Sequence, residues 1–549
     1  MNKVEIHIEN SRKYQFENGE LWFKGFLHNW EAFFTTIKDL SFTNKDNYDN
    51  FLSIIKNLDG QFSFVFQSNE ITVAVCDRIR SYPLFYGSIK GNFYISDRAM
   101  KLKNILGKLP QNKKAITCLM MSGYAYKNYT IYEKLYQLPA GFILKVNNIN
   151  AKSSISRYYN FSPWKSREYN LNQPKKELTD LMLNMYEKLI NSIDGRSICI
   201  SLSAGLDSRA IVSGLHHIGY KNVKCFSYGL QNNYEAAAGK KIAEKLNYPY
   251  YFVKKTPAIM RASFYSDAYK EFMQYSDTCA STPPVHQFYS VRKLKEVGFA
   301  SEEDVFINGY SGDFLTGGNI TQKINDAICF DEPKRKENIL QYIISKHYSL
   351  WENLKSCENI NIIKEIVWEQ FNHLFASEST GISDYAFCEN FEWKNRQTLH
   401  SMNQPRIYEF WGYDWRLPLW DYDFIDFWEK APLSLKFNQK LYRETLFENN
   451  WGNVWQNSKY PIYRSPCYIT PIRIILYIAM LPLGRKRWEE INKKYFHYWM
   501  EILCYMGIVD YRRVIKDKRG YRHAISWLTE FYLNDKGVYY SDSGKYVKD

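Results

Sequence analysis

The sequence lacks an apolar run long enough to cross a bilayer. Its longest, Ile474–Leu483 (IILYIAMLPL), has ten residues, about half of the roughly 20 that a membrane-spanning helix needs. Arg473 precedes the run, and Arg485, Lys486 and Arg487 follow it. We expect a buried helix with a solvated basic end. The alternative is peripheral contact of this basic tail with a membrane surface or an anionic carrier.

Signals for export and for metal clusters are also missing. The first twenty residues, MNKVEIHIENSRKYQFENGE, are polar or alternating and contain no apolar core of a signal peptide. The 10 cysteines are scattered, without a CxxC pair or a Cys/His cluster at metal-ligand spacing. We therefore expect a cytoplasmic protein with reduced thiols.

The composition is that of a folded protein with several domains. Of its 549 residues, 45% are hydrophobic and 24% are charged, which excludes a disordered or low-complexity chain. The 72 Lys and Arg exceed the 58 Asp and Glu, which gives a net charge of +14. This charge favours anionic partners, among them nucleotides, nucleic acid and membrane headgroups, without choosing between them.

Changes in pattern along the chain indicate four segments. Residues 1–160 contain short apolar or alternating runs between Gly, Asn and Asp turns, which predicts a β-rich domain. Residues 161–175 are polar and predict a linker. Residues 176–465 open with a helical pattern. From Ser197 to about Asn319 strand, glycine turn and helix alternate, which predicts an α/β domain with a parallel sheet, and residues 320–460 are predicted to be mainly helical. Residues 466–549 form a basic, aromatic C-terminal extension.

One strand-to-helix turn has the composition of a phosphate site. Within SICISLSAGLDSR, an apolar strand runs directly into Ser203–Ser208, and a helix follows. Small residues let backbone N–H groups approach an anion closely, and the helix N-terminus adds positive potential. Asp207 would repel a phosphate unless Mg²⁺ lies between its carboxylate and a polyphosphate. The alternative is an ordinary βα turn without a ligand.

A second acidic glycine turn strengthens the first interpretation. The apolar strand Val305–Asn308 is followed by Gly309, Tyr310, Ser311, Gly312 and Asp313. Two parallel strands that end in such turns would meet at the carboxyl edge of the sheet, where ligands bind in open α/β folds.

These turns resemble the asparagine synthetase family. Ser203–Ser208 is similar to its pyrophosphate loop, S-G-G-x-D-S, with Ala204 in place of the first Gly. Asn308–Gly318 resembles its segment S-G-E-G-x-D-E-L-x-G-G, and Arg416–Asp421 resembles R-x-P-F-L-D. The resemblance implies an adenine nucleotide α-hydrolase-like (PP-loop) synthetase domain.

The first domain resembles the family's class II glutamine amidotransferase domain, and this resemblance implies an α+β sandwich. Leu58–Phe64 is similar to L-D-G-M-F-A-F, Asp77–Tyr86 to D-R-x-G-x-K-P-L-Y-Y, and Leu138–Gly141 to L-P-P-G. Glutamine-dependent members carry a nucleophilic Cys directly after the initiator Met, whereas position 2 is Asn2 here and the first cysteine is Cys76. The domain is therefore expected to lack glutaminase activity; the alternative is that translation starts at another Met, which a cysteine follows.

The resemblance implies an ATP-dependent ligase that forms a carbon–nitrogen bond. Such an enzyme adenylates a carboxylate, releases pyrophosphate and transfers ammonia or an amine to the acyl group. A sugar acid of a surface polysaccharide, or aspartate, would be the substrate, and no specific nucleic acid is expected. Two alternatives stay open, namely a nucleic-acid-modifying PP-loop enzyme and a catalytically inactive scaffold.

Site residues carry over from the family position by position. The residues implied to bind ATP are Ser201, Ser203, Ala204, Gly205, Leu206, Asp207, Ser208, Phe226, Ser227, Asn308 and Gly309, and those implied to hold Mg²⁺ are Asp207 and Asp313. Tyr310 is implied to be catalytic, as in the β-lactam synthetases, with Glu392 or Glu409 as a candidate carboxylate partner. Lys459 is implied to stabilise the transition-state charge, with Lys440 as the next choice.

Overall fold

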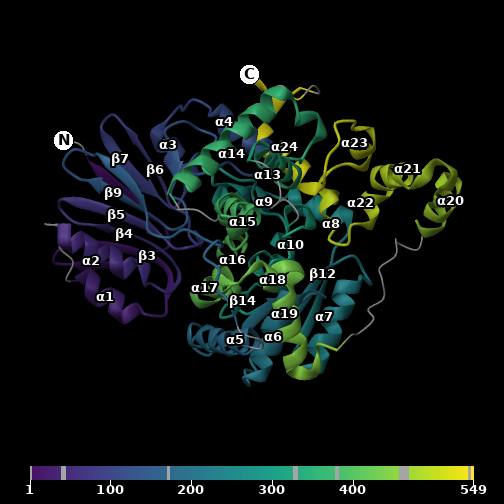
Figure 1. The fold of residues 1–549 in the computed structure, drawn as a ribbon, viewed down its shortest axis with the longest axis horizontal. Coiled ribbons are helices and arrows are strands. Elements are labelled where there is room, and N and C mark those ends of the chain that lie inside the picture. The colour runs from purple at the N-terminus through teal and green to yellow at the C-terminus, as the bar shows by residue number, and fades with distance from the viewer. Residues whose placement is uncertain are drawn as a thin grey trace.

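The computed structural model describes residues 3–38, 45–169, 173–325, 332–377, 382–456, 469–541, 544 and 546–548. Its N-terminal part is a sandwich of two sheets (Figure 1). The first sheet has the order β1 (Val4–His7), β7 (Asn92–Ser96), β6 (Phe85–Ile89) and β8 (Leu135–Gln137). The second has the order β10 (Ser153–Arg157), β9 (Phe142–Asn147), β5 (Ile71–Cys76), β4 (Gly60–Gln67), β3 (Gly19–Leu27) and β2 (Arg12–Phe16).

Strict alternation along β4 explains why the second sheet is buried on both faces. Phe62, Phe64 and Phe66 belong to one core cluster with residues of α1 (Trp30–Lys38) and α2 (Lys45–Lys56). Val65 faces the other way, into a cluster between the two sheets. Successive side chains of a strand point to opposite faces, so one run of apolar residues serves two cores. The predicted α+β sandwich is confirmed.

The second part is built on a five-stranded sheet whose strands are all parallel. Its order is β13 (Tyr250–Lys254), β12 (Val223–Gly229), β11 (Ile198–Ser201), β14 (Val305–Ile307) and β15 (Asp414–Arg416). The helices α5 (Gln173–Asn191), α6 (Leu206–His217), α7 (Tyr234–Lys245) and α10 (Phe288–Glu296) lie around it. Between β13 and α10 the chain forms α8 (Pro257–Phe264) and α9 (Asp267–Ser276). Because β11 and β14 are direct neighbours, the turns that follow them lie at the same edge of the sheet.

The segment around β15 is mainly helical, as predicted for residues 320–460. Before β15 lie α11 (Gly312–Leu315), α12 (Gln322–Asn325), α13 (Glu332–His347), α14 (Cys357–Ser377), α15 (Asp384–Glu392), the π-helical turn η3 (Trp393–Gln397) and α16 (Arg406–Phe410). After it lie α17 (Tyr422–Lys430), α18 (Leu433–Lys436) and α19 (Lys440–Asn449).

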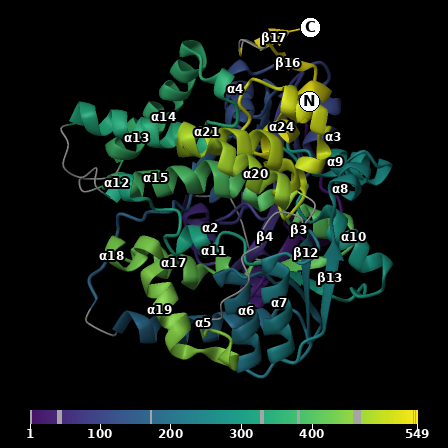
Figure 2. The same ribbon diagram turned by 90° about the vertical axis from the view of Figure 1, so that its right-hand side faces the viewer.

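The C-terminal residues divide into a packed half and a projecting half (Figures 1 and 2). In α24 (Ala524–Asp535), Trp527 is fully buried, with its ring 4.9 Å from that of Trp351. By contrast, α20 (Thr470–Met480) has no buried side chain, so the expected buried helix is wrong. A helix is buried only where other elements pack against it. Here α20 leads into α21 (Gly484–Ile491), and the two helices form a hairpin that extends away from the body of the molecule. In the described part of the chain, every helix is too short or too polar to span a membrane.

The remaining described elements complete the tail. They are α22 (His497–Met500), α23 (Tyr511–Lys516), β16 (Val538–Tyr540) and β17 (Tyr546–Lys548).

The sandwich and the parallel-sheet part contact each other through specific polar groups. Gln61 of β4 donates to the carbonyl oxygen of Leu417 at 2.8 Å and accepts from its backbone N–H at 3.2 Å. Nearby, the rings of Tyr82 and Trp415 stack with centroids 5.0 Å apart. These contacts attach the sandwich directly to β15 and the segment after it.

Candidate active site

The loop between β11 and α6 is held in shape by its own hydroxyl groups. Ser203 Oγ accepts from the backbone N–H of Gly205 at 3.1 Å, and Ser208 Oγ accepts from that of Ser203 at 3.2 Å. Gly205 is the N-cap of α6 and has no side chain to bond the first N–H groups of the helix. Those donors therefore stay available to an anion at the helix N-terminus.

Two residues expected to bind ATP support the loop from behind. Ser227 Oγ donates to the carbonyl oxygen of Leu202 at 2.5 Å, and the backbone N–H of Leu202 donates to the carbonyl oxygen of Phe226 at 2.7 Å. The Phe226 ring is fully buried, 6.1 Å from the ring of Phe306. The side chains at these positions therefore stabilise the sheet edge, and only their backbone is left to face a ligand.

The structure brings the two acidic turns together, as the sequence predicts. The backbone N–H of Asp313 donates to Asp207 Oδ2 at 3.1 Å. A Cβ atom added to Gly312 would lie 2.6 Å from Asp207 Oδ1, and one added to Gly309 would lie 2.9 Å from Asp207 Cβ. Only residues without a Cβ let the turn after β14 approach Asp207 this closely.

Asp207 retains an uncompensated carboxylate oxygen. Its Oδ1 is buried without a hydrogen-bond partner. The neighbouring Tyr442 hydroxyl lowers the pKa of Asp207, but by less than burial raises it. Burial and then the neighbouring Asp313 raise the pKa of Asp207 to about 8. The Asp313 side chain reaches solvent. Even so, the loss of hydration next to the protein raises the pKa of Asp313, and the positive charge of Arg396 only partly offsets this effect.

This pair of carboxylates fits a hard divalent cation. Oxygen ligands are the set that Mg²⁺ prefers, and it usually shares one or two carboxylates with substrate phosphates. A cation between Asp207 and Asp313 would compensate the buried oxygen and the repulsion between the two groups.

Tyr310 lies in a cluster of neutral polar groups. Asn308 Nδ2 donates to the Tyr408 hydroxyl at 2.9 Å, and that hydroxyl donates to Gln287 Oε1 at 2.7 Å. Burial first, and then Tyr408 and Tyr228, raise the pKa of Tyr310 well above its usual value. Tyr310 therefore keeps its proton and is suited to donate a hydrogen bond.

The two carboxylates considered as partners of Tyr310 are engaged elsewhere. Glu392 accepts from Lys346 at 2.6 Å and from Arg396 at 2.9 Å. Although burial opposes its ionisation, these cations lower the pKa of Glu392 to about 2. Glu409 accepts from the Tyr275 hydroxyl at 3.1 Å and from Trp415 Nε1 at 3.2 Å.

Two cations close to Asp313 were not found from the sequence. Lys346 and Arg396 both lower the pKa of Asp313. Arg396 lies in the π-helical turn η3, whose Gln397 Oε1 accepts from Ser311 Oγ at 2.5 Å. Such turns are frequent at functional sites, but no sequence signal marked this one. Lys459 lies outside the described residues.

Lys440, the second candidate after Lys459, lies within the residues that the structure describes. It is the first residue of α19 and is exposed.

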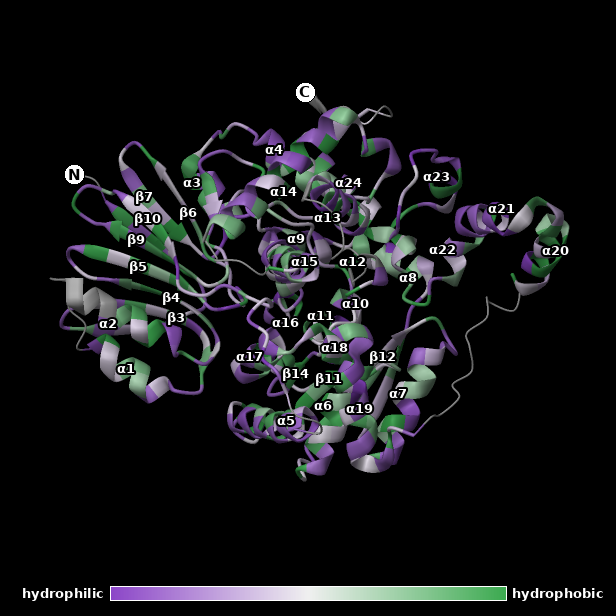
Figure 3. Cartoon of the chain, in the orientation of Figure 1, coloured by the Kyte–Doolittle hydropathy of each residue, from purple (hydrophilic) through white to green (hydrophobic). Residues whose placement is uncertain are grey.

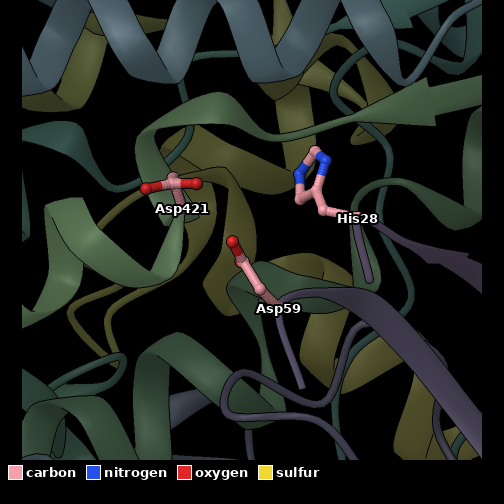
Figure 4. A group of neighbouring side chains, drawn as sticks. All are labelled: His28, Asp59 and Asp421. Atoms are coloured by element: carbon pink, nitrogen blue, oxygen red, sulfur yellow. The ribbon is translucent and has the colours of Figure 1, made fainter. Parts of the chain in front are cut away.

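A second cluster of ionisable groups lies between the two parts of the chain (Figure 4). Potential ligand atoms of His28, Asp59 and Asp421 lie within 4.8 Å of one another. The Lys188 ammonium lies 2.9 Å from Asp59 Oδ2 and 3.2 Å from Asp421 Oδ2. A lysine thus supplies the positive charge that a metal would otherwise bring, and the adjoining cavity of about 30 Å³ has room for about one water.

Comparisons with known proteins agree with the two-part architecture. A family model described as asparagine synthase matches residues 192–448, and one described as a glutamine amidotransferase domain matches residues 50–159. No curated protein matches the chain at a significant level.

Solved structures resemble the chain only weakly. The NH3-dependent NAD synthetase from Campylobacter jejuni is 12% identical over 38% of this chain and 98% of that one, with a TM-score of 0.20. The NMN synthetase from Francisella tularensis is 12% identical over 43% and 97%, with a TM-score of 0.21. The glutamine phosphoribosylpyrophosphate amidotransferase from B. subtilis is 12% identical over 56% and 59%, with a TM-score of 0.18. With TM-scores this low, these structures give no support for the fold or the function beyond that of the family models.

Proposed function

Since the chain belongs to the asparagine synthetase family and has an amidotransferase-like N-terminal domain, we propose that it is an ATP-dependent ligase that forms an amide bond. The observation that carries this proposal is the pair Asp207 and Asp313 beside the loop Ser203–Ser208. A carboxylate with an unpaired buried oxygen next to a phosphate-binding turn suits a polyphosphate with a bound cation.

In the proposed reaction, a substrate carboxylate attacks the α-phosphate of ATP and displaces pyrophosphate. The backbone N–H groups of the loop and the hydroxyls of Ser201, Ser203 and Ser208 would bind the leaving pyrophosphate. Asp207 and Asp313 would hold Mg²⁺, which when bound neutralises part of the polyphosphate charge. An amine then attacks the acyl-adenylate, forms the amide and releases AMP.

The raised pKa of Tyr310 changes the role that we propose for it. A tyrosine that keeps its proton is a poor base, so we assign it to donate a hydrogen bond to an oxygen of the substrate or the adenylate. We retain Lys459 as the residue that stabilises negative charge on the transferring group.

We further propose that ammonia, or an amine of the substrate, supplies the nitrogen. Both Cys76 and Cys118 are fully buried, and burial raises the pKa of Cys76 to about 12 and that of Cys118 further, so neither forms a useful thiolate. The sandwich would then shield the acyl-adenylate from water.

The substrate that we favour is a sugar acid of a surface polysaccharide rather than free aspartate. We place the reaction in the cytoplasm, where the free cysteines of the described residues would remain reduced.

The test is carboxylate-dependent exchange of labelled pyrophosphate into ATP, run with uronic acids and aspartate. We expect exchange with at least one acid, and AMP as the nucleotide product. Asp207→Asn and Asp313→Asn should each lower exchange at least a hundredfold, a loss of about 2.7 kcal/mol. The matched control is Asp267→Asn, on the surface of α9, which should leave exchange unchanged.

Two outcomes would overturn the proposal. One is accumulation of ADP and orthophosphate in place of AMP and pyrophosphate. The other is a variant of Asp207 or Asp313 that keeps more than about a tenth of wild-type exchange, a loss below about 1.4 kcal/mol.

A further inference from the structure

The most unusual surface of the molecule is the hairpin of α20 and α21. Seven large apolar side chains on α20 and the turn after it are 46% to 66% exposed, namely Ile472, Ile474, Ile475, Tyr477, Ile478, Leu481 and Leu483. Figure 3 shows this apolar colouring on α20, at the outer end of the projecting segment. Single exposed apolar residues are ordinary, but a contiguous set of this kind marks an interaction surface.

The hairpin is structured and does not depend on its apolar surface for its shape. Arg473 Nε donates to Asn492 Oδ1 at 2.8 Å, and its guanidinium lies 5.7 Å from the Trp488 ring. The rings of Tyr477 and Trp488 are 5.2 Å apart, nearly perpendicular. These contacts join the two helices on one side and leave the isoleucines of α20 pointing outward.

The charge of the hairpin favours an anionic surface. Residues 470–496 contain six Lys and Arg but only two acidic residues, Glu489 and Glu490. Those two pair with Arg485 and Arg487 within α21, and α20 itself has no acidic residue. Lys486 is exposed beside the apolar turn, so apolar and basic groups lie next to each other.

We propose that this hairpin docks the protein onto a membrane containing anionic lipids. The aliphatic side chains of α20 would enter the boundary between headgroups and acyl chains, while Arg and Lys bind lipid phosphates. Tyr477 and Trp488 are the aromatic types that favour this depth. A projecting, convex element reaches a flat bilayer directly, whereas a protein partner would have to supply a matching groove.

The experiment is flotation of the full-length protein with lipid vesicles. One set contains phosphatidylcholine alone, and the other contains phosphatidylcholine with 30% phosphatidylglycerol. We expect wild-type protein to float with the anionic vesicles, less so at high salt. The double variant Ile475→Asp, Ile478→Asp should lower the bound fraction at least tenfold.

The matched control is Ile149→Asp, because Ile149 is 75% exposed in the turn between β9 and β10, on the sandwich. It should bind as wild type does. The melting temperature of each variant shows whether it is folded, and neither should shift, since both sites are exposed. A charge variant, Lys486→Gln with Lys493→Gln and Lys494→Gln, should weaken binding to anionic vesicles without the loss of stability that a core change brings.

Three results would overturn the proposal. The first is wild-type protein that fails to float with anionic vesicles. The second is equal binding by the hairpin variant and the Ile149→Asp control. The third is a dimer, measured by light scattering, that Ile475→Asp, Ile478→Asp separates into monomers while vesicle binding stays absent; the surface would then bind a second copy of this chain.

Discussion

Asp77 and Asp207 each follow the end of a buried strand, one in the sandwich and one in the parallel-sheet part, but their surroundings differ. The Asp77 carboxylate accepts three backbone N–H groups at 2.9 to 3.2 Å. Asp207 accepts one, from Asp313, and its other oxygen is buried without a partner. Burial raises the pKa of both, to about 6 for Asp77 and about 8 for Asp207.

The Asp77 carboxylate has a structural role, because its hydrogen bonds hold a turn, whereas Asp207 has an oxygen that a ligand could still bind. Both aspartates belong to family motifs, so motif membership alone does not distinguish them. A buried polar atom without a partner destabilises a folded protein, and its persistence points to a bound group that compensates it. This difference supports the cation site that we propose in the parallel-sheet part, whereas the Asp77 carboxylate is satisfied by backbone groups of the sandwich.

The largest effect should come from closing the space between the two turns. Gly312→Ala would place a Cβ 2.6 Å from the Asp207 carboxylate and 2.5 Å from Leu419, and we expect pyrophosphate exchange to fall at least a hundredfold. Asp267→Asn, on the surface of α9, is again the control and should keep wild-type exchange. An active Gly312→Ala enzyme would show that the close approach of the turns is dispensable.

Exchanging each aspartate for asparagine should separate stability from activity. In Asp77→Asn, the amide group faces N–H donors, so the free energy of unfolding should fall by about 1–3 kcal/mol. Asp207→Asn should lose exchange but none of its thermal stability, because burial disfavours the ionised carboxylate, and an amide oxygen can still accept the backbone N–H of Asp313. Thermal unfolding of both variants at pH 7 is the measurement; a destabilised Asp207→Asn protein would contradict the comparison.

Two buried lysines differ in the same way, since one is paired with an opposite charge and the other bonds a neutral carbonyl group. Lys24 of the sandwich pairs with Asp97 at 2.7 Å. Lys255, at the end of β13, donates to the carbonyl oxygen of His286 at 2.8 Å, and burial lowers its pKa to about 7. Between pH 7 and about 10.5 the unfolded chain therefore binds a proton that the folded one lacks, so Lys255 makes stability rise with pH across this window.

Lys255→Met should remove that slope. We expect the variant to be more stable than wild type at pH 6, by roughly 2 kcal/mol after the lost bond to His286 is counted, and the gain should vanish near pH 10. Denaturant unfolding at both pH values measures this. If Lys255→Met were less stable than wild type at pH 6, the positive charge of Lys255 would be compensated within the folded protein.

The smallest expected effect is none at all. Cys76→Ala should leave ammonia-dependent amide formation within about twofold of wild type, because a buried thiol with a raised pKa takes no part in catalysis. Incubation with glutamine, ATP and Mg²⁺ should release no glutamate above the uncatalysed background. Glutamate release that disappears in Cys76→Ala would restore a glutamine-dependent enzyme.

Local patterns predicted the fold well, because alternation and glycine turns are local. The sandwich of residues 1–160 and the neighbouring turns after β11 and β14 agree with the structure. The direction of each side chain depends on packing and was harder to predict. Phe226 points into the core, and the hydroxyls of Ser203 and Ser208 bond the loop itself.

Long-range contacts account for what the sequence could not indicate. Arg396 approaches Asp313 only because α15 continues into a π-helical turn. In α20, an apolar sequence favoured a buried helix, but α21 contacts only one side of it, and the isoleucines stay exposed. Burial is decided by what packs against a helix, and its own residues do not encode that.

The two hydrogen bonds between Gln61 and Leu417 have a consequence for how this protein can evolve. Its carboxamide bonds both the N–H and the carbonyl oxygen of Leu417, and every amino acid except proline offers that same pair. The attachment of the sandwich thus places little demand on which side chain occupies position 417. Residues near the site can therefore change during evolution while the two halves of the molecule remain aligned.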